Sequence, residues 1–159
     1  MITTIREDGD GVVILDQTCL PAKETYVRLS SLSEAAHAIR VMQVRGAPLI
    51  GATAAYGVAL ALKDGVPLAE ACAVLAATRP TAVNLHWALA RMDQHLQPLA
   101  LPERPAAAWQ EARAIAQEDA QANGAIGSHG APLLVNAARP GRPLQVMTHC
   151  NAGILATVA

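Results

Sequence analysis

The longest apolar stretch of the chain, residues 49–62, reads LIGATAAYGVALAL and follows Pro48. This run is shorter than the roughly 20 residues that a membrane span needs. It predicts instead a buried helix, because proline suits the first helical position and the run has no charged residue. Gly51 and Gly57 weaken a helix, so their presence indicates close packing against neighbouring helices.

Around this helix the sequence predicts a mainly α-helical domain with a short β-hairpin or small sheet. Two short apolar runs predict the strands. Ser31 and Glu34 have the spacing of a capping box, and a helical pattern of apolar residues follows them. In the last helix, Gly124, Gly127 and Gly130 predict a break or kink. The expected strands are residues 12–15 and 26–29, and the expected helices are residues 31–44, 48–63, 68–77, 82–96 and 106–121, the last resuming as far as 137.

A second structural unit is expected after the proline- and glycine-containing segment at residues 138–143. Residues 144–147, a short and mainly apolar run, predict a buried strand, with a tight turn and the start of a helix after it. The predicted organisation is an N-terminal helical domain, residues 1–138, followed by the first strand of a truncated Rossmann-like α/β domain, residues 144–159.

Composition indicates a packed protein and argues against two classes of partner. Hydrophobic residues make up 52% of the chain and charged residues 16%, which is enough for a core and argues against disorder. The net charge is −1, with no cluster of basic residues or row of aromatic ones. Nucleic acid and anionic membranes are therefore not expected partners.

The cysteines and histidines predict neither disulfides nor a metal site. Cys19, Cys72 and Cys150 are far apart and form no CxxC pair, a pattern typical of reduced thiols in a cytosol. The histidines lack HxxxH or HExxH spacing. The N-terminus has no basic region followed by an apolar one, as a secretion signal would. We therefore expect a cytoplasmic protein without a metal.

Two arginines stand just ahead of predicted helix starts. Arg45-Gly46-Ala47 precedes the buried helix, and Arg79 precedes Thr81, a suitable N-cap for the helix expected at residues 82–96. Helix N-termini attract anions, and arginine can add a bidentate contact. Both segments therefore fit a phosphate site, or equally an ordinary turn before a helix. Sequence alone does not show whether they converge.

Cys150 follows His149 in a polar loop at the end of the strand predicted at residues 144–147. Ligands of open α/β sheets lie at the carboxyl ends of strands. A cysteine near a helix N-terminus and a histidine has a setting that lowers a thiol pKa. The alternative is an inert, half-buried cysteine, which is common because free cysteine packs as a small hydrophobic residue.

Five segments, in this order along the chain, resemble the methylthioribose-1-phosphate isomerase family. The resemblance covers essentially the whole chain, and roughly the first half of a full-length member. The wider family includes ribose-1,5-bisphosphate isomerases and regulatory subunits of a translation-initiation exchange factor. The segments are Leu15-Asp16-Gln17-Thr18, Val44-Arg45-Gly46-Ala47-Pro48, Arg79-Pro80-Thr81-Ala82-Val83-Asn84-Leu85, Ile126-Gly127-Ser128-His129-Gly130 and Thr148-His149-Cys150-Asn151-Ala152-Gly153.

The resemblance implies a specific reaction and specific roles. Members convert 5-methylthioribose 1-phosphate into 5-methylthioribulose 1-phosphate in methionine salvage, without a metal or organic cofactor, and act as homodimers. By carry-over, Cys150 is the catalytic residue. Arg45, Gly46, Ala47 and Arg79 bind the sugar phosphate.

One part of the family pattern does not occur in residues 1–159, and three hypotheses about this chain follow. The first is an N-terminal fragment of the isomerase. The family's aspartate acid/base lies in the α/β domain beyond residue 159, so the chain by itself is expected to lack isomerase activity. A second hypothesis is a non-catalytic module that binds a phosphosugar or nucleotide, or a regulatory subunit. The third is an inert truncated product that aggregates through residues 144–147, an unpaired apolar edge.

Overall fold

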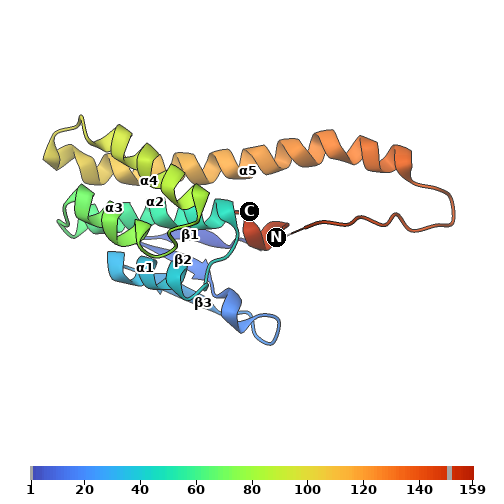
Figure 1. Ribbon diagram of the computed structural model, residues 1–159, viewed down its shortest axis with the longest axis horizontal. Coiled ribbons are helices and arrows are strands. Elements are labelled where there is room, and N and C mark those ends of the chain that lie inside the picture. Colours follow the sequence, from blue (N-terminus) through green and yellow to red (C-terminus); the bar gives the residue numbers. More distant parts are fainter. Residues whose placement is uncertain (1, 150–151) are drawn as a thin grey trace.

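A central helix, α2 (Ala47–Lys63), organises the computed structural model, which describes residues 2–149 and 152–159. Its residues 49–61 are all buried. In Figure 1, α4 and α5 lie on one side of this helix, and the sheet and α1 lie on the other. The prediction of a buried helix is confirmed. Within the described residues, no helix combines the length and apolarity that crossing a membrane requires.

A three-stranded antiparallel sheet with order β1-β2-β3 precedes the helices. The strands are β1 (Ile5–Asp8), β2 (Gly11–Leu15) and β3 (Tyr26–Leu29). The two predicted strands are therefore confirmed, whereas β1 was missed. Its sequence, IRED, has a single apolar residue, Ile5, which pairs with Ile14 of β2 and enters the core. So short a strand has no alternating pattern to read.

The helices around α2 mostly follow the predicted ranges. The first, α1 (Leu32–Arg40), has Ser31 as its N-cap, but it ends before the predicted residue 44 because Met42 adopts a left-handed backbone with φ 63°. The prediction of Thr81 as an N-cap is wrong, because Ala82 holds that place without a side-chain hydrogen bond. The remaining helices are α3 (Leu68–Ala76), α4 (Val83–Leu96) and α5 (Arg104–Ala137).

The last helix, α5, runs without interruption for 34 residues. Its first half packs on the core through Ala108, Ala112 and Ile115, whereas its second half projects into solvent (Figure 1). The predicted break at the three glycines, 124, 127 and 130, is therefore wrong. Local backbone hydrogen bonds hold the helix there, and its many alanines offset the unfavourable propensity of glycine.

Beyond the outer end of α5, the chain turns and runs back to the body (Figure 1). Residues 144–147 form no strand, which corrects that prediction: they are exposed, and no described strand pairs with them. Instead of the predicted helix start, a single 3-10 turn covers Ile154–Ala156. Ala156 and Val158 are then buried against the N-terminal body. The division into two domains stays a prediction.

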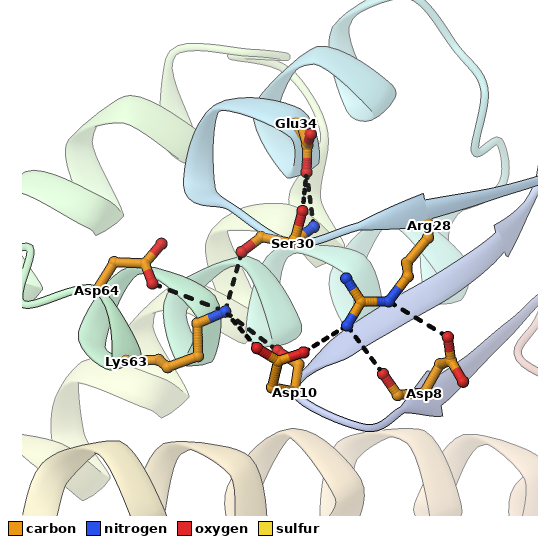
Figure 2. Close-up of polar contacts among 7 residues, drawn as sticks. All are labelled: Asp8, Asp10, Arg28, Ser30, Glu34, Lys63 and Asp64. Atoms are coloured by element: carbon orange, nitrogen blue, oxygen red, sulfur yellow. Dashed lines mark hydrogen bonds and ion pairs between the residues drawn. The ribbon is translucent and has the colours of Figure 1, made fainter.

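Charged side chains tie the β1–β2 turn to the end of α2 (Figure 2). The Arg28 Nε donates to Asp8 Oδ2 at 3.2 Å, and the same guanidinium pairs with Asp10. Lys63 Nζ donates to the carbonyl oxygens of Ser30 at 3.1 Å and of Asp10 at 3.2 Å. Both cations are partly exposed. Their main effect is to align the sheet with α2, since exposed ion pairs add little stability.

Replacement of Gly46 by alanine is expected to destabilise the chain. Gly46 has φ 94°, and a Cβ there would overlap the backbone of Ala156. We expect Gly46→Ala to lower the free energy of unfolding by about 3 kcal/mol, from strain and overlap together. Gly65→Ala is the control: its φ is 78°, but nothing lies within 4 Å. Urea unfolding should show a loss of only about 1 kcal/mol for the control, and equal losses would contradict the close contact.

Glu34 predicts a pH-dependent contribution to stability. It accepts hydrogen bonds from the Ser30 backbone N–H at 2.6 Å and hydroxyl at 2.9 Å, which hold the pKa of the Glu34 carboxyl below its ordinary value. The stabilisation is therefore complete above the unfolded-state pKa of about 4.3 and is lost as the pH falls through the folded-state pKa.

We expect Glu34→Gln to lower the free energy of unfolding by about 0.5 kcal/mol at neutral pH, a small value because the pair is exposed. The difference from the parent should shrink as the pH falls below the unfolded-state pKa. Urea unfolding at neutral pH and at a pH below that pKa measures it, with the exposed Glu70→Gln variant as the control. An unchanged difference at the lower pH would show that the hydrogen bonds do not depend on the charge.

Candidate functional site

The two arginine segments converge on one cleft. This cleft, with a volume of ≈ 770 Å³, lies at the N-terminus of α2. Arg45, Gly46 and Ala47 line it from the start of α2, and Arg79 lines it from the segment before α4. The sequence did not show this convergence. The cleft is completed by Met42, Ile50, Thr81, Ala82, Val83 and Asn84.

The first turn of α2 has backbone N–H groups without intrahelical partners, and its first residue, Ala47, lines this cleft. Its N-cap, Gly46, has no side chain to cap the helix, and the first intrahelical bond runs from the Ile50 N–H to the Gly46 carbonyl at 3.0 Å. The N–H groups of Ala47 and Leu49 therefore lack intrahelical partners, and Pro48 has no N–H. Together with the helix dipole, these amides favour an anion.

Arg45 and Arg79 add positive charge beside these amides. Arg45 is exposed and Arg79 is half-buried. Among residues 2–149 and 152–159, no carboxylate forms a salt bridge with either guanidinium. Both can therefore make bidentate contacts to a ligand. The cleft is chemically suited to a phosphate group, with apolar walls from Met42, Ile50 and Val83 for the rest of a ligand.

Gly51 explains why the N-terminal ends of α2 and α4 lie close together. A Cβ at Gly51 would lie 3.1 Å from the Asn84 carbonyl oxygen, in the first turn of α4. A Cβ at Gly57 would lie 3.1 Å from Ala35 Cβ and from Leu75 Cδ2. The close packing predicted from these glycines is confirmed. At the N-terminal end of α2 it sets α4, and the preceding Arg79, beside the first turn of α2.

The other predicted site residue, Cys150, lies outside the described residues. The described chain resumes at Ala152, and Ala156 then packs on Gly46 at the edge of the cleft.

Cys72 does not resemble a reactive thiol. Cys72 is half-buried, and burial, with a contribution from Asp93, raises its pKa to about 11. A thiol in that state is protonated at neutral pH and is a poor nucleophile. No group of three or more metal-ligating side chains occurs in the described part of the chain.

Asn84 is the site residue that sequence reasoning missed. Asn84 lines the cleft in the first turn of α4, but of the segment Arg79–Leu85 the sequence singled out only Arg79 as a binding residue. Its place three residues after Thr81, in a helix start that follows an arginine, was the available signal. Periodicity marked that position as polar without showing what it faces.

Comparison with known proteins identifies the family. The Initiation factor 2 subunit family matches residues 43–159. A methylthioribose-1-phosphate isomerase of Dechloromonas aromatica is 60% identical over 157 residues, which cover 95% of this chain and 43% of that protein. The chain thus spans less than half the length of this curated relative.

Two solved structures have the same fold over 99% of this chain, each at 37% identity. One is the 5-methylthioribose 1-phosphate isomerase of Pyrococcus horikoshii, with a TM-score of 0.86 and 46% of that chain covered. The other is the translation initiation factor eIF-2B subunit delta of A. fulgidus, with a TM-score of 0.84 and 47% covered. The resemblance to the isomerases is confirmed, and the chain belongs to the Initiation factor 2 subunit family.

Proposed function

We propose that this chain is the phosphate-binding part of an aldose-ketose isomerase that converts 5-methylthioribose 1-phosphate into 5-methylthioribulose 1-phosphate. The observation that carries the proposal is the convergence of Arg45 and Arg79 on the cleft at the N-terminus of α2. The relatives named methylthioribose-1-phosphate isomerase support the choice of substrate.

The cleft fits the demands of this substrate. A phosphate on the anomeric oxygen blocks the free aldehyde, so the ring must open before hydrogen moves from C2 to C1. In this proposal the two guanidinium groups and the amide of Ala47 hold the phosphate, and the buried side chain of Ile50 gives the cleft an apolar wall. Held in this way, the sugar carbons stay at a fixed distance from a catalytic group.

Cys150 is the proposed catalytic residue. The family resemblance supports this role, and further along the chain Ala156 packs on Gly46, which lines the cleft. We propose that the reaction takes place in the cytoplasm, needs no cofactor, and is carried out by a homodimer. Because the chain spans 43% of the Dechloromonas enzyme, we propose that these 159 residues bind the sugar phosphate without converting it.

A second candidate function is a non-catalytic module that binds a phosphosugar or a nucleotide. The likeness to the eIF-2B delta subunit, with a TM-score of 0.84, favours it. Ribose 1,5-bisphosphate is the alternative substrate for an isomerase built on the same cleft. The two enzyme proposals differ in the second phosphate, which would need a further cationic contact.

Removal of either cleft arginine is expected to weaken phosphate binding. Each of Arg45→Ala and Arg79→Ala should raise the Kd for inorganic phosphate about tenfold at low ionic strength, the loss expected for one charge-assisted contact. Isothermal titration calorimetry measures the Kd. Arg6→Ala, on the exposed edge of β1, is the charge-matched control and should leave it unchanged. Equal Kd values for all the variants and the parent would rule out the cleft as the site.

The 159-residue chain is expected to bind 5-methylthioribose 1-phosphate without converting it. Proton NMR measures conversion of the sugar, and phosphorus NMR measures binding of its phosphate group to the chain. Conversion at an enzyme-like rate that Cys150→Ala abolishes would contradict the proposal that the chain is inactive, while supporting the role of the cysteine. Absence of binding in both the parent and the Arg79→Ala variant would remove the binding proposal.

A further inference from the structure

The segment Leu15-Asp16-Gln17-Thr18 begins at the last residue of β2 and bonds to two other parts of the chain that lie near the cleft. None of its residues lines the cleft. Asp16 is 6% exposed, which is unusual for a carboxylate. Such burial calls for hydrogen bonds that satisfy the charge.

On one side, this segment holds the loop that carries Arg45. Asp16 Oδ2 accepts a hydrogen bond from Gln43 Nε2 at 2.8 Å, and the Gln17 backbone N–H donates to the Gln43 carbonyl at 2.9 Å. Gln43 is two residues before Arg45. Asp16 Oδ1 also accepts from the Thr18 backbone N–H at 2.9 Å and hydroxyl at 2.6 Å. The loop is thus fixed from both its side chain and its backbone.

On the other side, the same segment holds the C-terminal residues. Gln17 Nε2 donates to the Leu155 carbonyl at 2.6 Å. Next to it, Ala156 packs on Gly46, and the Val158 N–H donates to Asp119 Oδ2 at 2.8 Å. Gln17 therefore bonds the arginine loop through its backbone and the C-terminal segment through its side chain.

We propose that Asp16 and Gln17 are positioning residues that join the loop at residues 41–46 and the segment at residues 154–158 into one unit. The proposal deepens the proposed function, on which it rests, by naming the link between the phosphate cleft and the segment that follows Cys150. Binding of phosphate in the cleft then slows amide exchange at Ala156 and Val158, although neither residue lines the cleft.

The charge of Asp16 suits this role. Burial alone would raise the pKa of its carboxyl, but the hydrogen bonds from Thr18 and Gln43 outweigh burial and hold the pKa below its ordinary value. The carboxylate is therefore charged at neutral pH and accepts strong hydrogen bonds. Two segments that share one rigid anchor respond to each other, because displacement of either strains the same bonds.

Amide hydrogen exchange of the full 159-residue chain tests this link. Gln17→Met removes the donor to Leu155 but keeps the backbone bond to Gln43, and Gln43→Met removes the donor to Asp16. We expect each variant to speed amide exchange roughly fivefold in both segments, at residues 43 and 44 of the loop and at Ala156 and Val158 of the C-terminal segment. Gln94→Met, on the exposed side of α4, is the matched control.

Amides in the centre of α2 should exchange at the parent rate in both variants, which separates loss of the link from general destabilisation. If Gln17→Met speeds exchange only at residues 154–158, and Gln43→Met only at residues 43–44, the two segments are independent and the proposal is wrong. Because both variants are read without ligand, this result does not depend on phosphate binding.

Inorganic phosphate then gives the functional readout. In the parent, saturating phosphate should slow exchange at Ala156 and Val158, and Gln17→Met should abolish this slowing while changing the Kd for phosphate less than twofold. Slowing that persists in Gln17→Met overturns the proposal. Failure of the parent to bind phosphate would instead count against the proposed function, and the ligand-free comparison would still decide the link.

Discussion

The complete burial of α2 is the constraint on which the rest of the structure depends. A helix buried on all sides needs neighbours on all sides, and here the sheet and four other helices surround it. Its alanines and glycines let those neighbours approach closely. Only the ends of the helix then reach the surface, so its unpaired N-terminal amides become the natural place for an anion.

The cleft forms where two glycines allow other segments of the chain to approach the backbone of α2 and of its N-cap. The contact of Gly51 with the start of α4 brings Arg79 beside Arg45, and the contact of Gly46 with Ala156 brings the C-terminal segment to the same edge. In both places a glycine provides room that a side chain would fill. The geometry of the cleft is therefore a consequence of how the core packs.

Much of the fold could be predicted because its signals are local. Apolar periodicity, the Ser31 cap and the alanine content marked the helices close to their observed bounds. The errors arise where a local pattern was outweighed. Strand β1 exists through pairing with β2, Met42 ends α1 through its own backbone conformation, and residues 144–147 have strand-like composition but no described partner strand.

The sequence by itself determined the buried central helix, the placement of an arginine before each of two helix starts, and the resemblance to a family. These depend on residue type and spacing within one segment. Only the tertiary structure decided that Arg45 and Arg79 share a cleft, that Asn84 lines it, and that residues 154–158 return to Gly46. Those contacts join residues far apart in the chain. They form because many individually weak packing contacts around α2 form together.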